Sequence, residues 1–105
     1  MSKYHAVRTN GFASKAEDRR NSELVLLERA KVIRDLVRQP RYVLLPAWPE
    51  GGYKRPLVYV GDFEYFDKAA DKVILEDVKG IITPVYKIKK RLLEQLHGIK
   101  ITEVR

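Results

Sequence analysis

Three charged side chains follow two apolar, strand-like runs of the sequence, and together they could bind a metal ion and a phosphate. Asp62 follows the run 57–60, while Asp77 and Lys79 follow the run 73–75. Because side chains alternate along a strand, Asp77 and Lys79 point to the same face of the sheet. Carboxylates and an ammonium on a buried sheet face cost several kcal/mol unless a divalent cation or a phosphate offsets their charge. Oxygen ligands for a hard cation beside a lysine indicate metal-assisted cleavage of a phosphodiester.

The length and composition predict a single globular domain. The 105 residues are 45% hydrophobic and 33% charged, and a domain of this size buries roughly 65% of its unfolded surface, which is enough for a core. The absence of cysteine excludes a disulfide scaffold and a thiolate metal site. The N-terminus lacks an apolar signal segment, and no apolar run approaches the ~20 residues of a membrane span. We therefore expect a cytoplasmic protein with no membrane partner.

The net charge of +7 favours a polyanionic partner, and DNA is the partner that we expect. The basic residues gather in a few segments, and the acidic residues form no opposing tail. A solvated surface explains a basic helix face equally well unless an active site lies beside it. The candidates for phosphate contact are Lys15, Arg19, Arg20, Lys87, Lys90 and Arg91.

Hydrophobic spacing and breaker residues predict an α/β fold with a mixed sheet and the order αβββαβ, in one domain spanning residues 14–105. Residues 1–13 are expected to form a flexible basic arm. Ser14 is expected to cap a first helix that runs to about Val37, and Thr83 to cap a second helix. The expected strands cover residues 41–45, 57–66, 73–79 and 99–104, and the second helix covers residues 84–96.

The first helix offers a further carboxylate, but its spacing does not choose which one. Glu17, Glu28 and Asp35 fall near the same line of the helical wheel. Glu17 also stands three residues after the expected N-cap, so a capping-box role competes with a role at the site. Glu76 faces away from Asp77 by strand alternation, and we expect it to be a structural acid, paired with a lysine of the second helix.

The element order and four short segments resemble the PD-(D/E)XK nuclease superfamily, and within it a family of small phage-encoded endonuclease-like proteins. The segments are Phe12-x-Ser14-Lys15-x-Glu17, Gln39, Asp62-Phe63-x-Tyr65 and Glu76-Asp77-Val78-Lys79-Gly80. The resemblance covers nearly the whole chain, from about residue 4 to residue 104. Gly61 stands where the motif usually has proline, and Lys31 stands where relatives often carry glycine near the end of the first helix.

The resemblance assigns a role to each residue that matches the motif. It implies that Asp62 and Asp77 bind Mg²⁺ or Mn²⁺, together with the backbone carbonyl of Val78. Lys79 would be the catalytic lysine. Glu17 would be the helix carboxylate that completes the site.

The resemblance predicts a metal-dependent DNA endonuclease. The chain has no long base-reading element, so structure-selective cleavage of branched DNA or of a Holliday junction fits a small domain better than sequence-specific cleavage. A junction resolvase would act as a homodimer, because two strands must be cut. The alternative is a non-catalytic nucleic-acid-binding phage protein that keeps the nuclease fold. Trp48, in a loop rich in proline and glycine, either stacks on bases or closes the loop.

Overall fold

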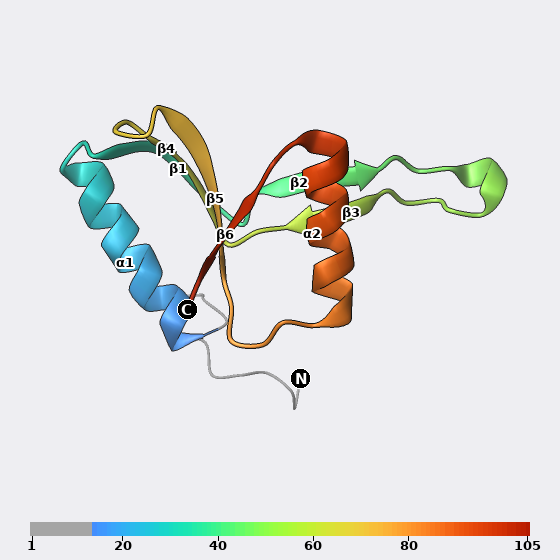
Figure 1. The fold of residues 1–105 in the computed structure, drawn as a ribbon, viewed down its shortest axis with the longest axis horizontal. Helices are drawn as coiled ribbons and strands as arrows, with labels where there is room; N and C mark the ends of the chain where they lie inside the picture. Colours follow the sequence, from blue (N-terminus) through green and yellow to red (C-terminus); the bar gives the residue numbers. More distant parts are fainter. Residues whose placement is uncertain (1–13) are drawn as a thin grey trace.

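The structure, a computed structural model, describes residues 14–105 and consists of two α-helices, a four-stranded sheet and a two-stranded sheet (Figure 1). Helix α1 spans Lys15–Arg29 and helix α2 spans Pro84–His97. This mixed α+β architecture in one small domain confirms the predicted fold class. The basic arm expected at residues 1–13 lies outside the described residues. Neither described helix is long and apolar enough to cross a membrane.

The four-stranded sheet is mixed. Its strands stand in the order β1, β4, β5 and β6. The first three are antiparallel neighbours, and β6 runs parallel to β5 after the crossover through α2. The two helices and the strands of this sheet follow the order αβββαβ, but the first strand, β1, lies in a segment predicted as helix and takes the place of the strand predicted at residues 41–45. The strands span Ile33–Arg38, Phe63–Asp67, Lys72–Val78 and Ile101–Val104.

A separate hairpin interrupts this order between β1 and β4. Strand β2 (Arg41–Leu45) pairs with strand β3 (Leu57–Val60), and a short 3-10 helix (Pro49–Gly51) lies near the tip. Figure 1 shows the hairpin in green, reaching past α2 and away from the large sheet. The expected strand at residues 41–45 is therefore present, but it belongs to the small sheet.

The large sheet buries an apolar cluster on each face. On one face, α1 contributes Leu24 and β4 contributes Phe63 and Tyr65. On the other, Leu75 of β5 packs in a cluster with Leu93 of α2. Because neighbours on a strand point to opposite faces, β5 divides its side chains between the two clusters. This division decides where the charged residues of β5 lie.

The first helix ends at Arg29, so its predicted extension to Val37 is wrong. The backbone N–H of Val32 donates to the carbonyl of Leu27, and Lys31 adopts the left-handed conformation (φ 63°). Such a residue closes the end of a helix and is usually glycine. The apolar spacing beyond Lys31 suits a helix as well as a strand, and there the chain forms β1, which pairs with β4.

The predicted strand 57–66 is two strands in two sheets, which corrects the expectation that Asp62 lies within a strand. The break falls at Gly61, whose N–H donates to the carbonyl of Pro40 (3.0 Å). A Cβ at Gly61 would lie 2.7 Å from Cδ1 of the buried Leu75. An added Cβ would therefore force the buried Leu75 side chain to shift, so glycine favours the crossing from β3 to β4 this close to the core. A proline there would also lose the hydrogen bond to Pro40.

The N-terminal caps of both helices and the C-terminal end of α2 agree with the prediction. Ser14 caps α1 through its Oγ, which accepts a hydrogen bond from the N–H of Glu17 (3.1 Å). Thr83 caps α2 in the same way, with the N–H of Tyr86 as the donor (3.1 Å), and Pro84 occupies the first turn. Gly98 ends α2 in the left-handed conformation (φ 66°).

Candidate carboxylate site

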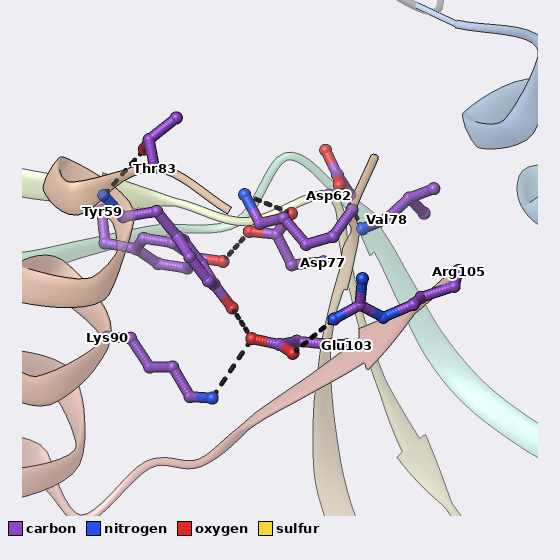
Figure 2. A network of polar contacts seen from close by, with 10 residues as sticks. Tyr59, Asp62, Asp77, Val78, Thr83, Lys90, Glu103 and Arg105 are labelled. Carbon is purple, nitrogen blue, oxygen red and sulfur yellow. Dashed lines mark hydrogen bonds and ion pairs between the residues drawn. The ribbon is translucent and has the colours of Figure 1, made fainter. Parts of the chain in front are cut away.

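Asp77 lies near the end of β5, on the face that packs against α2, and its carboxylate is held from two directions. It is only 5% exposed. The hydroxyl of Tyr59, on β3, donates to its Oδ2 (Figure 2). The ammonium of Lys79 lies 3.1 Å from its Oδ1. The prediction that Asp77 and Lys79 share a face is confirmed.

Asp62 stands in the short connection between β3 and β4, beside Asp77 (Figure 2). Its Oδ2 accepts a hydrogen bond from the backbone N–H of Val78 (2.6 Å). Its own N–H donates to the carbonyl of Glu76 (3.0 Å), and its carbonyl accepts from the N–H of Gln39 (2.9 Å). The connection is therefore fixed to β5, and the side chain of Asp62 is directed toward that strand.

The environment of Asp62 disfavours its charged form. Burial raises the pKa of this carboxyl to about 7, and the nearby negative charges of Asp77 and Glu17 add to the effect. The hydrogen bond from Val78 works in the opposite direction. Burial is the largest of these effects, and repulsion from the two neighbouring carboxylates adds to it.

Glu17 is the helix carboxylate that the structure places near Asp62. It is buried in the first turn of α1, and its charge acts on the pKa of Asp62. Glu28 instead accepts a hydrogen bond from the N–H of Leu36 at the surface. Asp35 is exposed and lies on β1 rather than on the helix. Of the three acids that helical spacing left open, Glu17 is the one that the structure places near Asp62.

Lys79 is held by an aromatic ring as well as by Asp77. Its ammonium lies 3.7 Å from the centroid of the Tyr86 ring, on α2. The hydroxyl of Tyr86 donates to Glu103 of β6 (2.8 Å), which also accepts from Lys90 (3.2 Å). These hydrogen bonds lower the pKa of Glu103, so it stays ionised and holds the hydroxyl of Tyr86. Figure 2 shows Lys90 and Arg105 directed toward the same carboxylate.

Glu76 points to the opposite face of the sheet from Asp77, as strand alternation predicts, but its partner is not the expected lysine of the second helix. Arg20, on α1, donates to both of its oxygens through Nε (2.8 Å) and Nη2 (2.6 Å). Tyr65 donates to it as well. The Glu76 side chain is 1% exposed. A bidentate Arg–carboxylate pair of this kind is a structural contact, because both partners are occupied.

The expected phosphate-binding residues fall into two groups. Lys15, Arg19 and Lys87 are exposed. The others have partners within the chain: Arg20 with Glu76 and Glu23, Lys90 with Glu103, and Arg91 with Gln95. Figure 1 shows that both helices begin on the side of the molecule where β5 ends. The first turns of the two helices, which carry Lys15 and Lys87, therefore lie on the same side of the molecule as the end of β5.

The side-chain atoms that this site offers as metal ligands are all oxygens, and Mg²⁺ and Mn²⁺ prefer oxygen ligands. Asp62 and Asp77 lie next to each other, and the raised pKa of Asp62 marks a position where a cation would relieve repulsion. Within residues 14–105, no three His, Cys, Asp or Glu side chains are arranged as a complete metal-binding group. The residues present thus fit two carboxylate ligands, with water and backbone left to complete the shell.

Sequence reasoning missed two residues of this network, Tyr59 and Glu103. In an unbroken strand, Tyr59 and Asp62 would point to opposite faces, so no strand pattern links them. The turn at Gly61 brings both side chains to Asp77. Glu103 is the register partner of Asp77 in the parallel pair of β5 and β6, and the sequence carries no signal for that pairing.

The chain belongs to the family described as protein of unknown function, DUF1064, whose model matches residues 1–104. No curated protein matches the chain. No solved structure matches it. The family description names no activity, so the function has to be inferred from the carboxylate site.

Proposed function

We propose that this protein is a metal-dependent DNA endonuclease of the PD-(D/E)XK type. One observation carries the proposal: two carboxylates, Asp62 and Asp77, lie side by side at the end of β5 with the ammonium of Lys79 against one of them. Surplus negative charge beside a fixed ammonium is a costly arrangement for stability alone. It suits a site that receives a divalent cation and a phosphate.

Each residue at the site has a distinct task in this proposal. Asp62, Asp77 and the carbonyl of Val78 would hold Mg²⁺ or Mn²⁺, and Glu17 would bind directly or through water. A bound divalent cation supplies an activated water and offsets charge on the phosphate. Lys79 orients that water and faces the negative charge that develops on the phosphate oxygens. Tyr59 fixes the orientation of Asp77, and burial raises the pKa of its hydroxyl, so that it stays a neutral donor.

The DNA backbone would contact the exposed basic residues beside the site. Lys15 and Arg19 begin α1, and Lys87 lies in the first turn of α2. Lys90 and Arg91 follow on α2 and could exchange their present partners for phosphates. Arg20 is not part of this set, since its guanidinium is bound to Glu76 and Glu23. Such contacts predict binding that weakens steeply with salt.

Branched DNA, including a Holliday junction, is the substrate that we propose. The described chain is small and offers no long element that could read bases in a groove. Two strands of a junction require two sites, so the active form would be a homodimer. Substrate preference and subunit number are therefore linked predictions.

The test is cleavage of a supercoiled plasmid and of a synthetic four-way junction with Mg²⁺, Mn²⁺ or EDTA. We expect metal-dependent cutting that falls about 100-fold or more in Asp77→Asn and in Lys79→Gln. Two matched controls, Asp35→Asn and Lys72→Gln, change the same residue types on the exposed surface and should cut normally. Cleavage that persists in Asp77→Asn would contradict the proposed site.

A second candidate function is non-catalytic nucleic-acid binding. It is favoured by the occupied oxygens of Asp77, each of which already contacts Tyr59 or Lys79. Fluorescence anisotropy with labelled junction DNA separates the two functions. Tight, salt-sensitive binding by a protein that cuts no DNA with any metal would establish the binding module instead.

A further inference from the structure

Two aromatic side chains stand exposed at the far end of the β2–β3 hairpin. Trp48 is 59% exposed and Tyr53 is 64% exposed. Their rings are nearly parallel (15°), with centroids 5.9 Å apart. Exposed aromatic pairs of this size are costly to solvate, and they usually mark a binding surface.

The hairpin tip holds the Trp48 ring in place without covering it. Trp48 and Tyr53 exchange two backbone hydrogen bonds (2.7 and 3.0 Å). Gly51 lies so close to the indole that an added Cβ would be 2.3 Å from the ring. Gly52 closes the turn with a left-handed conformation (φ 92°). The loop therefore packs Gly51 against the indole ring, while more than half of the Trp48 surface stays exposed to solvent.

A hollow of about 300 Å³ lies beside this pair. Its walls are almost entirely apolar, and one basic residue, Arg55, lines it. Lys54 is exposed next to Arg55. With Glu50 as the one acid, residues 46–57 at the tip carry a net charge of +1, from two basic residues and one acidic residue. Stacking surface and positive charge thus occur together at the tip.

We propose that the hairpin tip binds unpaired nucleobases, which stack on Trp48 and Tyr53 while Lys54 and Arg55 contact the adjoining phosphates. Stacking platforms flanked by basic residues bind single strands without reading their sequence. This assignment rests on the proposed nuclease function and narrows its substrate to DNA with an unpaired segment next to the cleavage position.

The length of the hairpin sets the distance between that segment and the cut. Tyr53 and Asp62 are nine positions apart along the chain, so an extended strand between them can span at most about 30 Å. A DNA strand rises about 3.4 Å per nucleotide. The unpaired bases would therefore lie within about nine nucleotides of the scissile phosphate.

A second copy of this chain fits the tip less well than a nucleic acid does. In a symmetric pair of hairpins, Lys54 and Arg55 of one copy would face the same residues of the other, and like charges across an interface oppose association. An unpaired DNA strand brings the opposite charge and an aromatic face at every base.

The chain contains one tryptophan, so its fluorescence reports directly on the hairpin tip. We would titrate the full chain in EDTA, where no cutting occurs, with an unlabelled 12-nucleotide oligo(dT) and with a blunt duplex of the same length. The proposal predicts quenching of Trp48 by the single strand and little change with the duplex. By anisotropy, Trp48→Ala and Tyr53→Ala should each bind labelled oligo(dT) roughly 5- to 100-fold more weakly.

Leu26→Ala is the control, because Leu26 is equally exposed (62%) on α1, and its affinity should not change. Equal quenching by duplex and single strand would overturn the proposal. Two further results would overturn the proposal in favour of contact with a second copy of the chain. The fluorescence emission of Trp48 would shift with protein concentration, and sedimentation would show a dimer that Trp48→Ala abolishes. The titration needs no cleavage, so it tests this inference separately from the nuclease proposal. Stacking without cutting would support this inference and contradict the nuclease proposal. Cutting without stacking would support the nuclease proposal and contradict this inference.

Discussion

Glu76 and Asp77 are neighbours on β5, yet their carboxylates lie in opposite electrostatic environments. Glu76, on the α1 face, has an Arg20 guanidinium bound to both of its oxygens and a hydroxyl from Tyr65. Asp77, on the α2 face, has one ammonium from Lys79 and a hydroxyl from Tyr59. It also has the carboxyl of Asp62 beside it, whose pKa is raised to about 7.

The comparison separates a structural acid from a candidate functional acid on the same strand. On the α1 face, the guanidinium of Arg20 contacts both oxygens of the buried Glu76 and also the exposed Glu23. On the α2 face, Asp77 and the neighbouring Asp62 lie beside one ammonium, and the repulsion between the two carboxylates adds to the effect of burial on the pKa of Asp62. Repulsion that a ligand would relieve is a common feature of functional sites.

The largest effect that we expect on stability comes from breaking the structural pair. Arg20→Ala should lower the free energy of unfolding by roughly 3 kcal/mol, because it leaves the buried Glu76 charge without its cation. Urea denaturation would measure the loss. The neighbouring Arg19→Ala is the control, since Arg19 is exposed, and its effect should stay within about 0.5 kcal/mol. Equal effects of the two substitutions would show that Arg20 does not stabilise the buried Glu76 carboxylate.

The next effect concerns the turn that brings Asp62 to Asp77. Gly61→Ala should cost about 1–3 kcal/mol, because the added methyl group would overlap the buried Leu75 side chain. Gly80→Ala is the matched control, as a Cβ there meets no atom within 4 Å. Thermal unfolding of both variants tests the prediction, and a Gly61→Ala protein as stable as Gly80→Ala would refute the close packing at this turn.

The surplus charge near Asp77 predicts a pH dependence without metal. The pKa of Asp62 is about 7 in the folded chain and about 3.9 when unfolded, so the folded state binds the proton more tightly. Stability from this group is present below pH 4 and is lost as the pH rises to about 7. In EDTA at pH 8, Asp62→Asn should therefore be more stable than the wild type, on the order of 1 kcal/mol after solvent screening.

Denaturation in urea from pH 4 to pH 8 would measure this difference. The difference in free energy of unfolding between Asp62→Asn and the wild type should increase as the pH rises, and it should decrease when Mg²⁺ is added at pH 8. A difference that stays constant from pH 4 to pH 8 would mean that the charge of Asp62 does not destabilise the folded protein.

The smallest effect that we expect concerns the C-terminal end of α1, where a substitution should change stability without changing activity at the carboxylate site. Lys31 holds a left-handed conformation (φ 63°) at the end of α1. Lys31→Gly should stabilise the protein by about 0.5–1 kcal/mol, because glycine adopts this conformation without strain. Calorimetry would detect a higher melting temperature, with cleavage activity unchanged. Loss of stability would show that the Lys31 side chain contributes more than its backbone strain costs.

The sequence predicted the helix caps, the strand with Asp77 and Lys79, and the opposite orientation of Glu76, because these depend on local chemistry and on strand alternation. It mistook β1 for a continuation of α1, since the apolar spacing around Ile33 fits both structures and Lys31 replaces the glycine that would mark the helix end. Such errors arise where the signal lies in backbone conformation rather than in residue type.

The site itself was only partly predictable, because two of its contacts depend on tertiary structure. The break at Gly61 comes from packing against Leu75 and from the hydrogen bond to Pro40, which are remote in sequence. The pairing of Glu76 with Arg20 joins residues 56 positions apart. Alternation along β5 assigns a face to each carboxylate, but it does not identify which cation lies on that face.

The central claim is that the Asp77 face lacks the positive charge that a divalent cation would supply. Electron paramagnetic resonance of Mn²⁺ titrated into the metal-free protein tests it directly by counting bound ions. The account predicts saturable binding to the wild type, at least a tenfold loss of affinity in Asp62→Asn, and no change in Asp35→Asn, whose carboxylate is exposed on β1. Equally weak binding by the wild type and Asp62→Asn would contradict it.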